Sequence, residues 1–201
     1  IPESIGSLIS LSKLTLSHND LSGQIPESIG SLINLSKLNL YNNDLSGQIP
    51  ESIGSLISLT ELNLSVNHLG CYEYNSIVDT CTTSCYNTDD CNAEIPESIG
   101  NLINLTGLYL NDNELRSRIP DSIGNLINLT KLSLSNNYLF GEIPSSVENL
   151  QNLYSLYLNN NELSGTLPAS ICPLSYSPGN IRFAYNQFCP PHPECWYGNQ
   201  G

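Results

Sequence analysis

The chain has 201 residues, of which only 12% are charged, and its 19 acidic and 6 basic side chains give a formal net charge of −13 at pH 7. Because an acidic surface repels phosphate backbones, we exclude nucleic acid as a partner. No apolar run approaches the roughly 18 residues of a membrane-spanning helix, so we expect no membrane span in this chain.

A repeated string organises the sequence from its first residue. The segment Ile1–Gln24 reads IPESIGSLISLSKLTLSHNDLSGQ, and Ile25–Gln48 repeats it almost unchanged. Further copies begin at Ile49, Ile95, Ile119 and Ile143, and a degraded copy begins at Leu167. Self-similarity at this period is typical of a solenoid, whose turns pack on one another. We therefore predict a single solenoid of about seven turns over residues 1–201.

The L-x-L segment of each copy predicts a short strand, as at Leu14–Leu16 and Leu38–Leu40. Strand side chains alternate between two faces, so we expect the leucines inside and the residue between them outside. The stacked strands would form a parallel sheet on the concave side. The E-S-I-G-x-L string predicts a short 3-10 or helical turn on the convex side, because the preceding Ile-Pro pair keeps the chain extended.

An Asn follows each strand, and this Asn column measures the period. Its members are Asn19, Asn43, Asn67, Asn113, Asn137, Asn161 and Asn186. The spacing is 24 residues, except for 46 after Asn67 and 25 before Asn186. We expect each amide to pair with backbone groups left open where the chain turns out of the strand. The Gly that follows, as at Gly47, suits a backbone conformation that a side chain would strain.

The full motif, L-x-x-L-x-L-x-x-N-x-L-x-G-x-I-P, resembles the plant-type leucine-rich repeat, and the match covers nearly the whole chain. That family includes ectodomains of plant receptor kinases and polygalacturonase-inhibiting proteins. The resemblance implies an α/β solenoid: a right-handed superhelix with a concave parallel β-sheet and a convex side of loops and 3-10 turns. It also implies binding of other molecules, with the partner set by variable surface positions.

An insertion interrupts the third copy from Cys71 to Asn92 and accounts for the longer spacing. Its four cysteines, which predict two internal disulfides in one of three connectivities, are Cys71, Cys81, Cys85 and Cys91. A thiol metal site is disfavoured, because the spacing fits no common zinc pattern. The tyrosines Tyr72, Tyr74 and Tyr86 are candidate contacts to a ligand or a neighbouring subunit. The alternative is a stapled loop without a partner.

The segment 167–201 resembles the cysteine-paired C-terminal caps of secreted leucine-rich repeat proteins. Such a cap hides the last open strand edge. Cys172 could pair with Cys189, which would leave Cys195 for a partner farther along. Pairing of Cys189 with Cys195 is the rival arrangement.

Cysteine placement favours an extracellular protein, because all seven cysteines lie in the insertion and the C-terminal segment rather than in the repeats. The odd number implies a free thiol, an intermolecular bridge or a partner beyond Gly201. No Met occurs, and the chain starts at the first residue of a repeat. We therefore expect a mature or partial chain without its signal peptide and N-terminal cap.

Outward strand positions predict a polar, mostly uncharged concave face. The candidate ligand-binding residues on it are Asn39, Tyr41, Glu61, Tyr109, Asp112, Lys131, Tyr157 and Asn159. Amide and tyrosine side chains make adaptable contacts and also suit saccharides. We therefore expect a protein or polysaccharide ligand, with a solvated face that binds nothing as the alternative.

Sequons predict glycosylation at Asn34, Asn63, Asn104 and Asn128. The acidic column formed by Glu3, Glu27, Glu51, Glu97 and Asp121 could be bridged by calcium, but no ligand set resembles a known calcium loop. None of the histidines His18, His68 and His192 has a placed nucleophile beside it. With no catalytic motif present, we expect no enzyme, no catalytic residue, no cofactor and no metal.

The leading hypothesis is a secreted or cell-surface recognition module that binds through its concave face. The alternative is a structural protein, because nearly uniform repeats and an odd cysteine suit self-association into extracellular filaments or a surface layer. Ice binding by regular rows of Thr, Ser and Asn is a third, weaker hypothesis, since the concave residues are too mixed for a lattice match.

Overall fold

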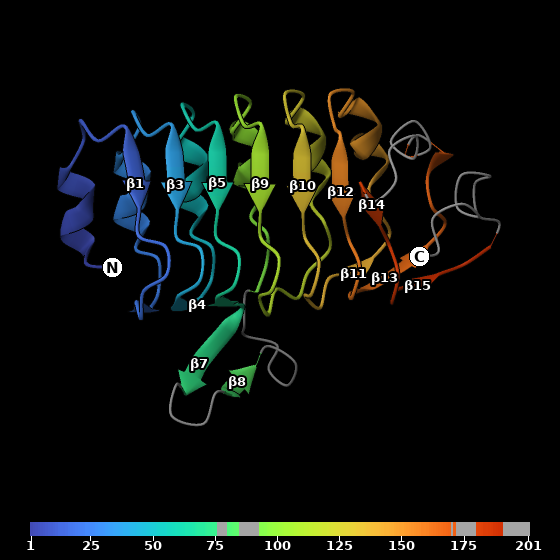
Figure 1. Cartoon of the computed structure of the whole chain (residues 1–201), viewed down its shortest axis with the longest axis horizontal. Coiled ribbons are helices and arrows are strands. Elements are labelled where there is room, and N and C mark those ends of the chain that lie inside the picture. The colour runs from blue at the N-terminus through green and yellow to red at the C-terminus, as the bar shows by residue number, and fades with distance from the viewer. Residues whose placement is uncertain (76–79, 85–92, 170, 172–179, 191–201) are drawn as a thin grey trace.

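The computed structural model describes residues 1–75, 80–84, 93–169, 171 and 180–190, with backbone alone for 72–75 and 80–84. The turns stack side by side along one axis (Figure 1). One strand from each turn joins a seven-stranded parallel sheet in the order β1-β3-β5-β9-β10-β12-β14. These strands are β1 (Lys13–Thr15), β3 (Lys37–Asn39), β5 (Glu61–Asn63), β9 (Gly107–Tyr109), β10 (Lys131–Ser133), β12 (Ser155–Tyr157) and β14 (Ile181–Arg182).

The sheet confirms the predicted solenoid, and it places equivalent residues of successive turns side by side. Leu38 aligns with Leu14 on one side and with Leu62 on the other, and all three are buried. Each of the first six strands begins and ends one residue earlier than its L-x-L segment. The second leucine still continues the ladder, because Leu16 N donates to Asn39 O at 2.9 Å, but the chain turns directly after it.

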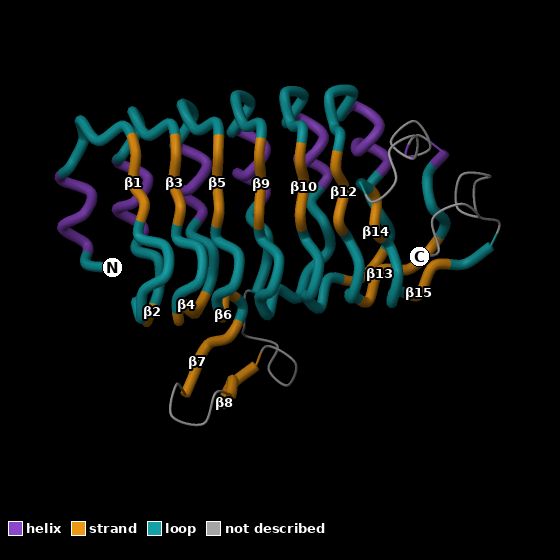
Figure 2. The backbone as a smooth tube through the Cα atoms, in the orientation of Figure 1, coloured by secondary structure: helices purple, strands orange, loops and turns teal. Residues whose placement is uncertain are grey.

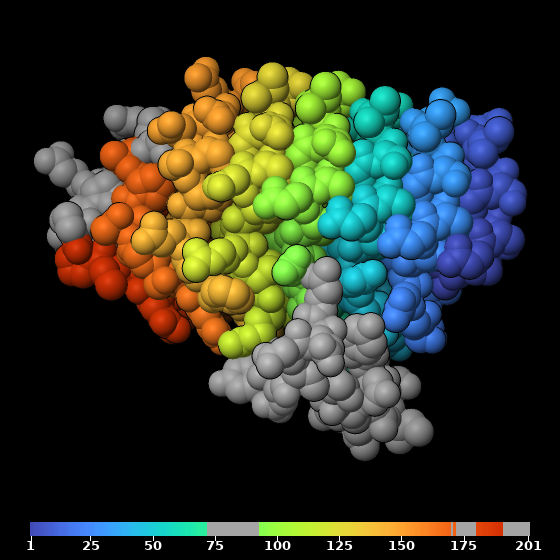
Figure 3. All heavy atoms as spheres, turned by 180° about the vertical axis from the view of Figure 1, so that it is seen from behind, coloured from blue at the N-terminus to red at the C-terminus, as the bar shows by residue number. Residues whose placement is uncertain are grey.

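Each of the first six turns carries one 3-10 helix on the convex side, as predicted. The helices are η1 (Glu3–Ser7), η2 (Glu27–Ser31), η3 (Glu51–Ser55), η4 (Glu97–Asn101), η5 (Asp121–Asn125) and η6 (Ser145–Asn149). An extended Pro precedes each helix, and its fixed φ starts the turn without needing a backbone donor. Figure 2 shows these helices behind the strands, and Figure 3 shows the turns from that side as successive bands.

The Asn column performs the predicted structural task. Asn137 Nδ2 donates to Leu110 O at 3.0 Å in the preceding turn and to Leu134 O at 3.1 Å in its own turn. Its Oδ1 accepts from Leu115 N at 3.1 Å. One buried amide thus joins two turns. Buried backbone groups need such partners, so the column stabilises every turn that has a neighbour before it.

Beyond the Asn column the chain forms a second edge, made of two three-stranded parallel sheets. Their strands are β2 (Ser22–Gly23), β4 (Asp44–Gly47), β6 (His68–Leu69), β11 (Phe140–Gly141), β13 (Glu162–Gly165) and β15 (Gln187–Phe188). Gly47 has a φ of 78°, as the glycine prediction requires. We call this the second-sheet edge, and it lies at the bottom of the solenoid in Figure 1.

The insertion leaves the second-sheet edge after Gly70 as an antiparallel pair, β7 (Cys71–Asn75) with β8 (Thr80–Ser84). The chain pairs with the fourth turn on both sides of the insertion. Glu114 N donates to Leu69 O before the insertion, and Arg116 N donates to Ala93 O after it. Cys71 is buried and disulfide-bonded. Tyr72, Tyr74 and Cys81 are described by backbone alone, and Tyr86, Cys85 and Cys91 lie outside the described residues.

The predicted pairing of Cys189 is wrong, whether with Cys172 or with Cys195. Cys189 is a free, exposed cysteine. Its backbone N–H donates to Gly165 O at 2.8 Å, which extends the β13–β15 pairing by one residue. The thiol then lies at the surface beside Gln187 O, at 3.9 Å. Cys172 and Cys195 themselves lie outside the described residues.

Within the described part of the chain, no helix has the length and apolar character to cross a membrane.

Candidate functional site

Strand register arranges the outward side chains of the concave sheet in two straight rows. The lysine row contains Lys13, Lys37, Glu61, Gly107, Lys131 and Ser155. The tyrosine row contains Thr15, Asn39, Asn63, Tyr109, Ser133, Tyr157 and Arg182. Neighbouring strands lie about 4.8 Å apart, so residues some 24 positions apart in sequence touch here.

An ion pair and local hydrogen bonds occupy the N-terminal half of this face. Lys37 Nζ lies 2.8 Å from Glu61 Oε1, and both side chains are about one-third exposed, so the pair adds little stability. Asn39 Oδ1 accepts from Tyr41 N at 3.0 Å. Asn63 Oδ1 accepts from Ser65 N and from Ser65 Oγ. Both Asn side chains therefore use their oxygen to hold the turn after the strand.

Aromatic and cationic side chains occupy the C-terminal half. Lys131 Nζ lies 5.2 Å from the ring centroid of Tyr109 and 5.6 Å from that of Tyr157. The guanidinium carbon of Arg182 lies 5.4 Å from the Tyr157 centroid. The small, buried Ser133 separates the two tyrosines in their row and leaves room for the Lys131 ammonium. Cation and ring attract each other at these separations.

Tyr109 is half-buried within this group. Its ring folds back over Gly107, where a side chain would collide with it. Burial, followed by the negative charge of Glu61, raises the pKa of Tyr109 above its usual value of 10.0, and Lys37 partly opposes the shift. The phenol is therefore neutral at physiological pH, with an O–H that can donate to a ligand.

The remaining predicted residues form the lower rim of the face. Tyr41 packs edge-on against His18, with ring centroids 4.8 Å apart. Asp112 accepts from Asn111 Nδ2 and Asn136 Nδ2, both at 2.6 Å. Asn159 is half-buried on the same rim. The rim residues that precede each Asn of the column adopt a left-handed backbone conformation, and they are His18, Asn42, Val66, Asp112, Asn136, Asn160 and Tyr185.

The structure thus brings Glu61, Tyr109, Lys131 and Tyr157 together on consecutive strands. It separates them from Tyr41, Asp112 and Asn159 on the rim, and from the insertion. The sequence prediction missed Gly107 and Arg182, and it counted Lys37 as an outward residue of the concave face but not as a ligand-binding candidate. Arg182 could have been found, because it stands four residues before Asn186, as Tyr157 stands four before Asn161.

The sequon residues Asn34, Asn104 and Asn128 are exposed on the opposite edge of the solenoid. Each amide donates to a carbonyl of the preceding turn, as Asn104 Nδ2 does to Ile57 O at 2.9 Å. Asn63 instead lies on the concave sheet. Glycosylation at all four positions stays a prediction.

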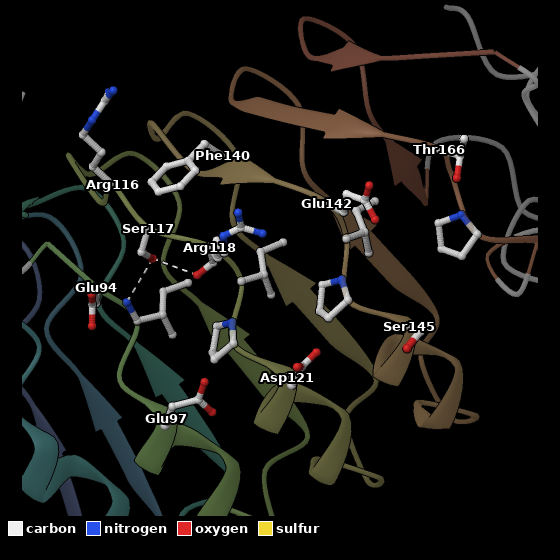
Figure 4. A pocket seen from close by; sticks show the side chains of 16 residues that line it. Glu94, Glu97, Arg116, Ser117, Arg118, Asp121, Phe140, Glu142, Ser145 and Thr166 are labelled. Atoms are coloured by element: carbon white, nitrogen blue, oxygen red, sulfur yellow. Dashed lines mark hydrogen bonds between the residues drawn. The ribbon is translucent and has the colours of Figure 1, made fainter.

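A groove of about 790 Å³ runs along turns four to six, between the second-sheet edge and the first residues of the 3-10 helices η4, η5 and η6 (Figure 4). Its charged lining residues are Glu94, Glu97, Arg116, Arg118, Asp121 and Glu142. Arg116 points away from the others and pairs with Glu162 at 3.4 Å. Across the described residues, no three His, Cys, Asp or Glu side chains are grouped to hold a metal. The candidate site is placed on the concave face, because Tyr109, Lys131 and Tyr157 lie together there.

Comparisons with known proteins agree with this architecture. One family model described as Leucine rich repeat matches residues 4–69, and a second with the same description matches residues 104–126, 128–150 and 152–174. Among curated proteins, no sequence matches the chain.

Solved structures match over most of the chain. The ectodomain of the Arabidopsis thaliana receptor kinase GASSHO1/SCHENGEN3, in complex with CASPARIAN STRIP INTEGRITY FACTOR 2, is 37% identical with a TM-score of 0.78. The Arabidopsis receptor kinase HAESA, in complex with the peptide hormone IDA and the co-receptor SERK1, is 34% identical with a TM-score of 0.79. Both matches cover 94% of this chain. A plant ice-binding protein is 27% identical over 87% of this chain and 57% of its own, with a TM-score of 0.67.

The chain is much shorter than the two receptor ectodomains, since it spans 20% of the GASSHO1/SCHENGEN3 chain and 28% of the HAESA chain.

Proposed function

The chain belongs to the leucine-rich repeat family, and from that membership we propose that it is an extracellular, non-enzymatic recognition module whose concave face binds a peptide segment of a protein ligand. The receptor ectodomains that resemble it support this proposal, because the HAESA structure holds a peptide hormone. The ligand of this chain is argued from the residues of its own concave face.

One observation carries the proposal: Tyr109, Lys131 and Tyr157 lie side by side on β9, β10 and β12, facing outward from a rigid sheet. Tyrosine supplies a large contact area at a low cost in conformational entropy, which makes it common in binding surfaces. The convex strings hardly vary between turns, whereas these concave positions do. Diversity confined to one face supports a ligand-binding role for that face.

A selection from a displayed random-peptide library would test the proposal. We expect the chain to enrich peptides that lose about tenfold or more in affinity when Tyr109 and Tyr157 are both changed to Ala. Tyr138→Ala is the matched control, because Tyr138 is equally aromatic and 49% exposed but lies away from the concave sheet. Equal losses in both variants, or no enriched peptide, would overturn the proposal.

Two other outcomes would redirect it. A polysaccharide that binds in a glycan screen and loses affinity in the double Tyr variant would make a saccharide the ligand of the same face. Long filaments in negative-stain electron micrographs, with a repeat equal to one solenoid, would make self-assembly the main role.

Ice binding is a second candidate, because the structure shows a more regular surface than the concave face. The turns that join each 3-10 helix to the next strand line the upper edge in Figure 1. Five isoleucines recur there, each between 53% and 60% exposed: Ile9, Ile33, Ile57, Ile103 and Ile127. Beside them Thr60, Thr106 and Thr130 each donate to a carbonyl one turn back, which fixes the hydroxyls in one orientation.

Thermal hysteresis of a dilute solution would decide this candidate. We expect a freezing gap that disappears in Ile103→Lys and persists in Tyr138→Lys, which adds the same charge elsewhere. A wild-type chain without a freezing gap would eliminate ice binding and would leave peptide recognition untouched.

A further inference from the structure

The groove along turns four to six is lined by charges of mainly one sign. Figure 4 shows two walls on either side of the Ile-Pro pairs that form its floor. The residues of the helix-side wall are Glu97, Asp121 and Ser145, and those of the opposite wall are Phe140, Glu142 and Thr166. Glu94 lies at one end, and Arg118 lies between the walls. Because Arg116 points away, the groove presents four carboxylates and one guanidinium.

Three of these carboxylates, those of Glu97, Asp121 and Glu142, form no ion pair within the described part of the chain. The guanidinium of Arg118 forms none there either. All four residues are exposed, so water solvates their charges while the groove is empty. A cleft lined mainly by one sign of charge concentrates ions of the opposite sign. The groove therefore attracts cationic groups.

The groove differs in composition from the same edge of the first turns. Where turn five has Glu142, turns one and two have the uncharged Gln24 and Gln48. Phe140 likewise stands where the first two turns have a serine. The charge and the aromatic ring of this wall are therefore features of the groove and not of the repeat.

Glycine residues leave room for the long side chains of this wall. Arg118 lies over Gly141 of the next turn, with its Nη1 3.3 Å from the position that a Cβ would take there. Glu142 lies over Gly165 in the same way, with its Oε1 2.9 Å from the equivalent position. Both charged groups therefore lean along the groove toward its C-terminal end.

We propose that the groove binds a basic segment of a partner protein, one that carries at least two Lys or Arg side chains. Their charged ends meet Glu97 and Asp121 on one wall and Glu142 on the other. Their apolar stems pack on the Ile-Pro floor and against Phe140, whose ring is 38% exposed and attracts cations. The groove volume of about 790 Å³ lies within the range of about 300–1,000 Å³ that is usual for ligand sites.

The 201 residues of this chain do not supply the basic segment. Those outside the described ranges contain neither Lys nor Arg. Four of the six basic residues lie in the lysine and tyrosine rows of the concave face, and the other two are Arg116 and Arg118 at the groove itself. The concave sheet of a second copy cannot enter a groove, because its surface curves inward. Charge complementarity therefore points to a different protein.

Selection of displayed 12-residue random peptides on the 201-residue chain would test the proposal. We expect a class of enriched peptides with two or more Lys or Arg residues. These peptides should bind Glu97→Gln/Glu142→Gln about tenfold more weakly, because two exposed ion pairs are lost. Added salt should weaken them as well, because it screens such pairs. Their affinity for Tyr109→Ala/Tyr157→Ala should stay within about twofold of the wild-type value, since the groove is separate from the concave face.

Two further variants supply the controls. Glu3→Gln/Glu27→Gln removes the same charge from two exposed residues that also begin 3-10 helices but lie outside the groove. It should change the affinity for the basic peptides by less than about twofold. Arg118→Gln removes the one cation of the groove and should strengthen their binding about threefold. A variant that merely disturbed the fold would not bind more tightly.

The outcomes separate this proposal from recognition by the concave face. Equal losses in the two glutamate variants would overturn it, because the attraction would then come from the net charge of the molecule. Basic peptides that are lost in the double Tyr variant would also overturn it, since they would occupy the concave face. A selection without basic peptides would eliminate the groove as their docking site and would leave concave-face recognition to be judged by the other enriched peptides. Weaker binding to Arg118→Gln would contradict the proposed arrangement of charges.

Discussion

The ring of Tyr109 lies over Gly107, two residues earlier on β9. Its Cε2 atom is 2.9 Å from the place that a Cβ at residue 107 would take, and its hydroxyl oxygen is 3.3 Å away. Every other turn described has a side chain at this point of the lysine row. The missing side chain at Gly107 therefore leaves the space that the Tyr109 ring occupies on the concave face.

Gly107→Ala should displace the Tyr109 ring without unfolding the chain. The atoms that an alanine meets belong to the far end of a flexible side chain, so we expect unfolding free energy to change by less than about 1 kcal/mol. Affinity for a selected peptide should fall about tenfold. Chemical denaturation and peptide titration measure the two effects. An unchanged affinity would show that peptide binding does not depend on the position of the Tyr109 ring over Gly107.

Alkaline pH should reveal the burial of Tyr109. Its pKa is raised in the folded chain, so the neutral form is favoured by folding. This contribution is complete below the unfolded pKa of about 10 and is lost as pH rises through the folded value. Tyr109→Phe should therefore lose less stability than the wild type between neutral pH and the alkaline range. Parallel slopes of unfolding free energy against pH would contradict this prediction.

The contribution of each Asn of the column to stability should depend on whether its side chain bonds to a preceding turn. Asn137→Ala removes bonds to two turns and leaves Leu110 O, Leu134 O and Leu115 N open, so we expect a loss of about 3 kcal/mol. Asn19 is exposed and bonds only to Leu16 O and Ser17 O in its own turn. Asn19→Ala should cost less than about 1 kcal/mol. Similar costs in urea denaturation would show that the bonds between turns are not decisive.

Val66 is the unfavourable member of the left-handed positions. Its φ is 56°, which a β-branched side chain tolerates poorly, whereas Asn accepts it. Val66→Asn should raise unfolding free energy by about 1 kcal/mol. The reverse change at the equivalent position, Asn136→Val, should lower it by more, because it also removes the hydrogen bonds to Asp112 Oδ1 and from Asn160 Nδ2. Thermal denaturation checks the pair, and a destabilised Val66→Asn would refute the argument.

Two glycines with similar backbone conformations should differ in their tolerance of alanine. Both have positive φ, 97° at Gly70 and 76° at Gly23. An added Cβ at Gly70 would lie 2.2 Å from Glu114 O, whereas at Gly23 it meets nothing within 4 Å. We expect Gly23→Ala to cost about 1 kcal/mol and Gly70→Ala about 3 kcal/mol or more. Equal costs would mean that the next turn yields to the added methyl group.

The sequence by itself determined the solenoid, the 3-10 turns and the task of the Asn column. It could do so because each unit repeats the same local signals every 24 residues, and a parallel stack then aligns like with like. The polar character of the concave face and the candidates Glu61, Tyr109, Lys131 and Tyr157 followed from the same alternation.

Only the tertiary structure decided how those candidates combine. The contact of Lys131 with two rings depends on strand register, on the small Ser133 between them and on the missing side chain at Gly107. Arg182 joins them because the degraded seventh turn still pairs with β12. The position of Cys189 was likewise visible only in the structure, where its backbone N–H donates to Gly165 O and its free thiol is exposed, since spacing between cysteines does not say where each side chain points.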